Sequence, residues 1–195
     1  MTYLLGLTGS IGMGKSTTAR IFADMGHPVW DADAAVHGLY GPDGAAVDPV
    51  GRIFPDAIRD RAVDRQALKR IIAGDDTALP RLEAVVHPLV AADRRAFVAA
   101  HADAPLIVLD IPLLFESAAP PDLDGIAVVT TDAATQRRRV LARPGMTEES
   151  FAMILARQLP DADKRARADF IIPSDSLETA RAAVQQIVEK VTADA

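Results

Sequence analysis

The sequence contains no cysteine and no asparagine, and each absence excludes a class of structure or function. Without cysteine, the chain can form neither a disulfide framework nor a thiolate metal site. This composition suits the cytoplasm, where we expect the protein to act. Without asparagine, the chain cannot carry the Asn-Lys-x-Asp sequence with which switch GTPases recognise guanine, so that class is disfavoured.

Long apolar runs and excess basic charge are missing as well. The longest apolar stretch, residues 106–115, is broken by Asp110 and Pro112 and is too short to span a bilayer. The first apolar run has no basic residues before it, so we expect a strand there and not a signal peptide. The formal net charge is -6, which disfavours binding to nucleic acid or to a membrane. We expect small-molecule partners and a monomer or small homo-oligomer.

The composition that remains is that of a globular protein with an α/β core. The 195 residues are 49% apolar and 25% charged, enough for one such core with insertions. Helical segments alternate with short apolar runs, which predicts an α/β fold with a five-stranded parallel sheet. The predicted strands cover residues 3–7, 27–30, 106–109, 126–129 and 170–172. After the last of them, Leu177 begins the apolar face of a helix that should pack on the sheet.

A glycine-rich segment follows the first predicted strand. Residues 9–16 read Gly-Ser-Ile-Gly-Met-Gly-Lys-Ser and match the P-loop pattern G-x-x-x-x-G-K-S/T, with a helix-like segment after them. Glycine lets backbone N–H groups approach an anion, and the helix N-terminus adds its dipole. A chance match is rare in a chain of this length. We predict nucleotide binding here, with Lys15 on the β- and γ-phosphates and Ser16 on Mg²⁺. The predicted phosphate-binding residues are Gly9, Gly12, Met13, Gly14, Lys15, Ser16 and Thr17.

Two carboxylates follow the second predicted strand. Asp31 and Asp33 come at its carboxyl end, where open α/β sheets gather their ligands, and they project to one side if the chain is still extended. Either could contact Mg²⁺ or take a proton from an acceptor. Asp33 could instead cap a helix that begins at Ala34. The residues alone leave both interpretations open.

Residues 34–103 have a helical pattern without a convincing strand. Asp64 should cap a helix over 65–73, and a longer helix should span 78–101. We expect this insertion to hold the phosphoryl acceptor. His87 lies inside it, and its position favours a helix-surface or capping residue over a ligand contact.

A third acidic residue follows the apolar run at 106–109. Asp110 ends this run, where a Walker-B carboxylate would act on Mg²⁺ directly or through water. Leu114 and Glu116 follow, and they fit the lining of an acceptor site and simple packing equally well. Further along, Asp132 should cap a helix after the fourth strand.

Arginine is concentrated near residue 140 of this acidic chain. Arg139 and Arg143 belong to a cluster at 137–143 that Pro144-Gly145 ends, and a second helix should run from Thr147 to about Leu159. A solvated helix face is one explanation. The other is a lid whose guanidinium groups stabilise the charge of a transferred phosphoryl group and whose closing excludes water.

Taken in order, these segments resemble the dephospho-CoA kinase family over nearly the whole chain. The resemblance is most specific at Asp31-Ala32-Asp33 and at 110–116; the other matching segments are 6–16, 87–90, 139–143, Gln158 and 168–172. It implies a P-loop NTPase fold of three α/β/α layers. It also implies ATP-dependent phosphorylation of the ribose 3′-hydroxyl of dephospho-CoA with Mg²⁺. The implied parts are a nucleotide-binding core (1–33, 104–136 and 165–195), a helical CoA-binding region (34–103) and a lid (137–164).

The resemblance also implies roles for single residues. Asp33 would be the general base, Lys15 and Arg139 would act on the transferred phosphoryl group, and Arg143 would bind phosphate from the lid. The acceptor would contact Thr8, Asp31, Asp33, His87, Leu114 and Glu116.

The chain departs from the family pattern in two places. Pro173-Ser174 stands where Asp-Asn usually follows the last strand near the adenine, and Pro144 stands where an acidic residue is common. The nearest alternative function is that of another small-molecule P-loop kinase, acting on a nucleoside or a nucleoside monophosphate.

Overall fold

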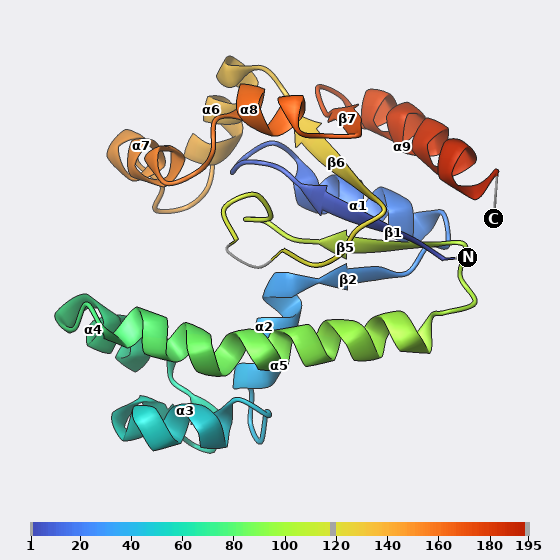
Figure 1. The fold of residues 1–195 in the computed structure, drawn as a ribbon. Helices are drawn as coiled ribbons and strands as arrows, with labels where there is room; N and C mark the ends of the chain where they lie inside the picture. The colour runs from blue at the N-terminus through green and yellow to red at the C-terminus, as the bar shows by residue number, and fades with distance from the viewer. Residues whose placement is uncertain (1, 118–119, 194–195) are drawn as a thin grey trace. The chain divides into compact units, whose positions relative to one another are not determined.

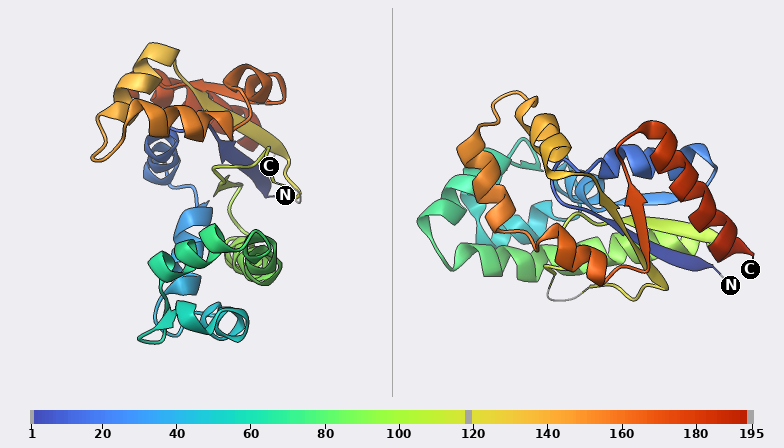
Figure 2. Two further views of the ribbon diagram at one scale, coloured as in Figure 1. Left: turned by 90° about the vertical axis from the view of Figure 1, so that its left-hand side faces the viewer. Right: turned by 90° about the horizontal axis from the view of Figure 1, so that it is seen from above.

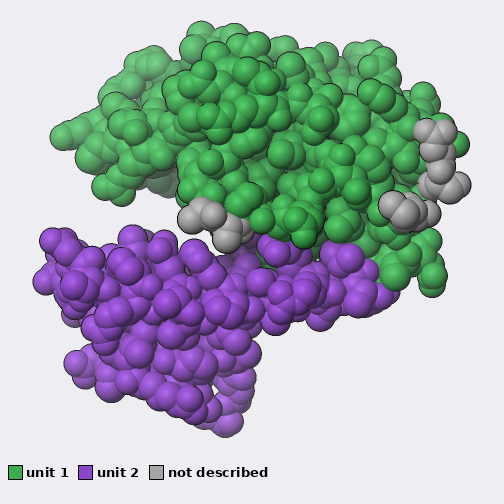
Figure 3. All heavy atoms as spheres, in the orientation of Figure 1, with its two compact units in different colours: residues 1–30, 101–195 green, residues 31–100 purple. Residues whose placement is uncertain are grey.

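The computed structural model describes residues 2–117 and 120–193, which form two compact units. The first unit comprises Met1–Trp30 and His101–Ala195, and the second comprises Asp31–Ala100 (Figure 3). The second unit begins and ends slightly earlier in the sequence than the predicted insertion at 34–103. Within the described residues, no helix is long and apolar enough to cross a membrane.

The first unit is built on a five-stranded sheet (Figure 1). The strands lie in the order β2-β5-β1-β6-β7, and β1 pairs in parallel with both β5 and β6, as β6 does with β7. All five residues of β5 are buried, as its continuous apolar run predicts. The predicted α/β fold with a five-stranded sheet is therefore confirmed. The strands are β1 (Tyr3–Thr8), β2 (Val29–Asp31), β5 (Leu106–Asp110), β6 (Gly125–Thr130) and β7 (Phe170–Pro173).

Two helices cover one face of this sheet. Helix α1 (Lys15–Asp24) and helix α9 (Leu177–Thr192) contact each other and the strands, and Phe22 and Val184 are fully buried between them and the sheet. Burying a side chain as large as phenylalanine stabilises a fold by roughly 1.5–3 kcal/mol. Leu177 is 60% exposed, so the prediction that it joins the apolar face is wrong. Ser176 accepts a hydrogen bond from Thr179 N and begins the helix before that face starts.

Three shorter helices lie between β6 and β7. They are α6 (Ala133–Leu141), α7 (Glu148–Ala156) and α8 (Asp161–Ala166), and α8 contacts β6 from the side of the sheet opposite α9 (Figure 2). Asp132 caps the first, as predicted, and Thr147 caps the second, where a helix was expected to begin. Arg137 forms an ion pair with Glu148 between α6 and α7. Helix α7 ends three residues before the predicted end at Leu159, and α8 was not predicted.

The second unit is mostly helical. Asp64 caps α4 through Gln66 N and Ala67 N, which confirms the predicted cap, and the 23-residue helix α5 contains Pro88 in its interior. The expectation of no strand is wrong, because β3 and β4 form an antiparallel hairpin. Its turn residues Asp60 and Arg61 have φ of 50° and 60°, values typical of a type I′ turn. The elements are α2 (Ala32–Tyr40), α3 (Val47–Ile53), a 3-10 turn (Pro55–Ala57), β3 (Ile58–Arg59), β4 (Ala62–Val63), α4 (Arg65–Gly74) and α5 (Ala78–Ala100).

Candidate active site

The glycine-rich loop joins the end of β1 to the beginning of α1. Gly14 is the N-cap residue of α1 with φ of 92°, and Thr18 returns both its N–H and its hydroxyl to Gly14 O. The first N–H groups of a helix have no partner within that helix, and the positive end of its dipole lies beside them. Lys15 and the exposed Ser16 and Thr17 stand on this first turn. The loop therefore has the backbone geometry of an anion-binding cradle.

Two of the glycines are required by conformation and by space together. Gly12 has φ of 79°, and a Cβ built on it would lie 2.5 Å from Val140 Cγ2 of α6. A Cβ on Gly14 would lie 3.0 Å from Ser174 Oγ. Residues with a side chain rarely adopt such φ values, so both positions favour glycine for its conformation and for its lack of a Cβ. The close neighbours also show that the loop is enclosed by α6 and by the residue after β7.

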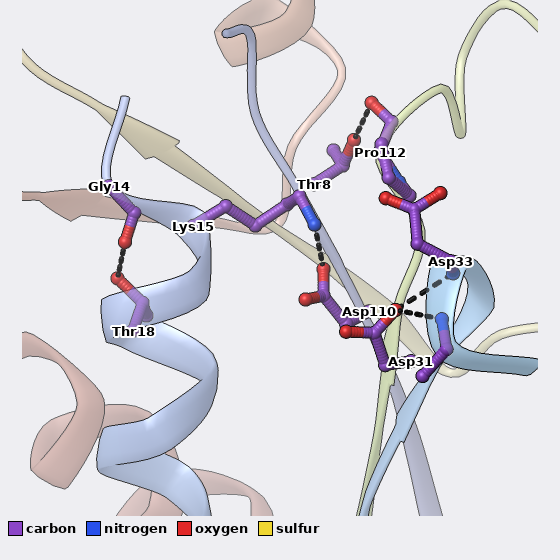
Figure 4. A network of polar contacts seen from close by, with 9 residues as sticks. Thr8, Gly14, Lys15, Thr18, Asp31, Asp33, Asp110 and Pro112 are labelled. Atoms are coloured by element: carbon purple, nitrogen blue, oxygen red, sulfur yellow. Dashed lines mark hydrogen bonds and ion pairs between the residues drawn. The ribbon is translucent and has the colours of Figure 1, made fainter. Parts of the chain in front are cut away.

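Lys15 and Asp110 form the central ion pair of the site (Figure 4). Lys15 Nζ lies 2.5 Å from Asp110 Oδ1, and only 15% of the lysine side chain and 3% of the aspartate side chain are exposed. Asp110 ends β5, next to β1 in the sheet, so adjacent parallel strands bring the two charges to the same edge. Lys15 and Asp110 thus lie close together at the loop, while their predicted contacts with phosphate and with Mg²⁺ stay predictions.

Arg139 of α6 lies beside the same loop. Its guanidinium donates to Ser174 Oγ at 3.1 Å and to Ser174 O at 2.6 Å, and Ser174 Oγ in turn donates to Met13 O at 2.6 Å. Ser174 therefore connects the arginine to the loop backbone. Sequence reasoning noted Ser174 only as a departure after the last strand and did not predict this contact. Arg143 is exposed beyond the end of α6, and its phosphate contact stays a prediction.

Three residues of the first unit that were predicted to contact the phosphoryl acceptor are hydrogen-bonded to other protein groups or are buried. Thr8 Oγ1 donates to Pro112 O at 3.2 Å, and Leu114 is buried. Glu116 Oε1 accepts from Leu159 N at 2.8 Å and lies 2.9 Å from Lys164 Nζ. Burial would raise the pKa of Glu116, but Lys164 and the Leu159 N–H outweigh it and hold the pKa below its ordinary value. These contacts favour packing for Leu114 and Glu116, and the predicted contacts of these residues with substrate stay predictions.

The second unit contains the remaining predicted residues. Asp31, the last residue of β2, caps α2 by accepting from Asp33 N at 2.8 Å and from Ala34 N at 3.0 Å (Figure 4). The proposed capping role of Asp33 is therefore wrong, as is the extended conformation, because Asp33 already lies in the first turn of α2. Its carboxylate is exposed. His87 is exposed on α5, in agreement with a helix-surface position.

The donor atoms fit a magnesium ion that is shared with phosphates. Within residues 2–117 and 120–193, no group of three or more His, Asp or Glu side chains is arranged to hold a metal. Mg²⁺ seldom needs such a cage, because it keeps several waters and takes one or two protein oxygens beside the phosphates. The Ser16 hydroxyl and the Asp110 carboxylate are oxygens of that kind near Lys15.

A glycine cradle, a lysine paired with a strand-end aspartate and an arginine-bearing helix over the loop define a P-loop protein of the small-molecule kinase class. The family model for dephospho-CoA kinase matches residues 3–179. A dephospho-CoA kinase of Cereibacter sphaeroides is 57% identical over 195 residues, which cover 99% of this chain and 98% of the relative. The chain belongs to the dephospho-CoA kinase family.

Solved structures share the fold of this chain. The crystal structure of TT1252 from Thermus thermophilus is 34% identical and superposes with a TM-score of 0.82, covering 97% of both chains. The dephospho-CoA kinase from Campylobacter jejuni has 22% identity and a TM-score of 0.68 over 97% of both chains, and it shows the same fold.

Proposed function

We propose that the protein transfers the γ-phosphoryl group of ATP to the ribose 3′-hydroxyl of dephospho-CoA, giving coenzyme A and ADP. The observation that carries the proposal is the Lys15–Asp110 pair at the glycine cradle, in a chain that belongs to this family over most of its length. We further propose that the protein acts in the cytoplasm, as a monomer or small homo-oligomer.

The reaction exchanges one bond to phosphorus for another. The 3′-oxygen attacks the γ-phosphorus, the bond from that phosphorus to the β–γ bridging oxygen breaks, and ADP leaves. Asp33 accepts the proton of the hydroxyl. It is suited to this role because its carboxylate is exposed two residues after the end of β2, whereas Asp31 is engaged as a helix cap.

The first unit supplies the donor side of the reaction. The N–H groups of the loop and of the first turn of α1 bind the phosphates, and Lys15 and Arg139 neutralise charge that spreads over the phosphoryl oxygens. Mg²⁺, when bound by Ser16 and Asp110, would withdraw charge from the β- and γ-phosphates. The second unit, residues 31–100, is proposed to hold dephospho-CoA.

The proposal is tested by incubating the purified chain with Mg-ATP and dephospho-CoA and measuring coenzyme A by mass spectrometry. Parallel reactions contain nucleosides or nucleoside monophosphates in place of dephospho-CoA. We expect ADP and coenzyme A in equal amounts and no ADP above background in the parallel reactions. ADP formation with a nucleotide acceptor and none with dephospho-CoA would instead identify the nearest alternative, a nucleoside or nucleoside monophosphate kinase.

A further inference from the structure

Ile11, in the middle of the P-loop, is hydrogen-bonded through both of its backbone polar groups to glutamine side chains. Gln136 Nε2 donates to Ile11 O at 2.8 Å, and Ile11 N donates to Gln158 Oε1 at 3.1 Å. The amide orientations follow from the backbone, because a carbonyl can only accept and an N–H can only donate. One glutamine is therefore a donor and the other an acceptor.

Gln136 directly precedes the predicted lid, residues 137–164, and Gln158 lies near the end of that lid. Gln136 is buried in α6, and Gln158 follows α7, so the chain between them contains the whole arginine cluster at 137–143 and all of α7. Both ends of this segment are thus attached to a single residue of the phosphate-binding loop. The next residue along the chain, Leu159, is itself fixed by its N–H bond to Glu116.

The loop needs such attachments because of its glycines. Gly12 and Gly14 have φ of 79° and 92°, and glycine permits many other backbone conformations at little cost. A peptide unit is planar and trans, so its C=O and N–H point in opposite directions. Fixing Ile11 O toward Gln136 therefore points Gly12 N–H away from Gln136. In the same way, the hydrogen bond from Ser174 Oγ to Met13 O points Gly14 N–H away from Ser174.

We propose that Gln136 and Gln158 are positioning residues that hold the Ile11 peptide units in the orientation required for nucleotide binding. Each acts through the loop backbone. The Met13 N–H bond to Ser10 O at 3.1 Å agrees with this arrangement, because a fixed Ile11 N–H points Ser10 C=O the opposite way. Loss of either side-chain bond frees a peptide unit beside a glycine, so phosphate binding weakens.

The same substitution at the two positions should have opposite results. Gln158→Glu keeps an oxygen that accepts from Ile11 N, whereas Gln136→Glu places an oxygen against Ile11 O and removes the donor. Both variants add one negative charge beside the same residue, so the difference between them reports on the direction of the hydrogen bond. Gln136→Met and Gln158→Met remove each bond without adding charge, and Gln185→Met on α9 is the matched surface control.

Binding of a fluorescent ATP analogue to the full chain, measured without dephospho-CoA, is the direct readout. One lost hydrogen bond should raise the Kd by about 3- to 10-fold in each methionine variant, and Gln136→Glu should raise it by more than about 10-fold. Gln158→Glu should bind better than Gln158→Met, and Gln185→Met should match the wild type. The KM for ATP should follow the Kd, while the KM for dephospho-CoA stays unchanged.

Two results would overturn the proposal. One is a wild-type Kd in both methionine variants, and the other is a Gln158→Glu variant that binds no better than Gln158→Met. Urea unfolding of each variant identifies a merely structural role, which would lower stability without changing the Kd of the folded fraction. If Gln136→Glu does not fold, the two Gln158 variants still decide the outcome. The inference rests on the proposed function only for its KM values, since a chain that binds ATP and makes no coenzyme A refutes the function alone.

Discussion

Replacing Glu116 by glutamine tests the ion pair that joins the segment after β5 to helix α8. Lys164 is fully buried, Glu116 is 18% exposed, and their charged atoms lie 2.9 Å apart. Glutamine has nearly the same shape and keeps an oxygen for Leu159 N, which lies 2.8 Å from the carboxylate. The substitution therefore removes the negative charge and leaves the packing and the backbone hydrogen bond in place.

The expected loss follows from the burial of Lys164. Removing one partner of a buried ion pair leaves an uncompensated charge out of water and destabilises a protein by about 3–5 kcal/mol. We expect about 3 kcal/mol for Glu116→Gln, at the lower end, because the carboxylate is partly exposed. Replacing both charges, in Glu116→Gln with Lys164→Met, should recover most of this stability, because neither charge of the pair then remains.

Urea unfolding followed by circular dichroism at neutral pH measures these free energies. The single and double variants are compared with the wild type, and Lys164→Met alone completes the double-mutant cycle. A Glu116→Gln variant within about 0.5 kcal/mol of the wild type, as for an ordinary surface substitution, would refute the reasoning. A double variant that is less stable than Glu116→Gln alone would also refute it.

The same pair predicts how stability depends on pH. Burial acts to raise the pKa of Glu116, but Lys164 and the Leu159 N–H bring it below its ordinary value of 4.5 in the folded state. A carboxylate with a depressed pKa stabilises the fold above its unfolded pKa, and this contribution is lost as the pH falls through the folded pKa. We expect the wild type to lose stability below about pH 4.5 more steeply than Glu116→Gln does.

Three further substitutions, the first with a matched control, test the donor and acceptor sides. Gly14→Ala should lower stability by about 1–2 kcal/mol through its positive φ and also weaken ATP binding, whereas Gly26→Ala, with a similar φ and open space around it, should lower stability alone; equal Kd values for ATP would contradict this. Lys15→Met should reduce kcat by about 10²-fold or more in the coenzyme A assay. A smaller loss would show that Lys15 does not supply the positive charge that stabilises the transferred phosphoryl group. Asp33→Asn should leave ATP binding nearly intact while transfer falls by about 10²-fold or more; unchanged transfer would exclude it as the base.

The sequence predicted well those features that depend on neighbouring residues. The P-loop, the Asp64 cap and the buried strand ending at Asp110 each rest on a pattern of a few adjacent residues, and all lie where they were expected. The errors fall where local signals compete or are too short. Asp31 and Asp33 are both suitable helix caps, and only the exact end of β2 decides between them. Hairpin strands of two residues have too few positions to show an alternating pattern.

The contacts that shape the site could not be predicted in this way. Gln136, Gln158 and Ser174 bond to Ile11 and Met13 across 125 to 161 positions of the chain. No periodicity or turn signal connects residues so far apart, and a buried glutamine in an arginine-rich helix resembles any other polar residue. Only the folded structure shows which backbone atom each of these side chains reaches.

The donor site is therefore made by two distant parts of the chain that have different tasks. Residues 9–16 supply N–H groups and glycines. The glycines let the loop backbone approach a phosphate closely but do not fix the conformation of the loop. Residues 136–174 supply the side chains that fix it, and Arg139 belongs to the same set. Substitutions of the site residues in either part should thus raise the Kd for ATP. Substitutions in residues 31–100 should change the KM for dephospho-CoA and leave the Kd for ATP unchanged. A variant within 31–100 that weakened ATP binding in the absence of dephospho-CoA would show that this division of tasks is wrong.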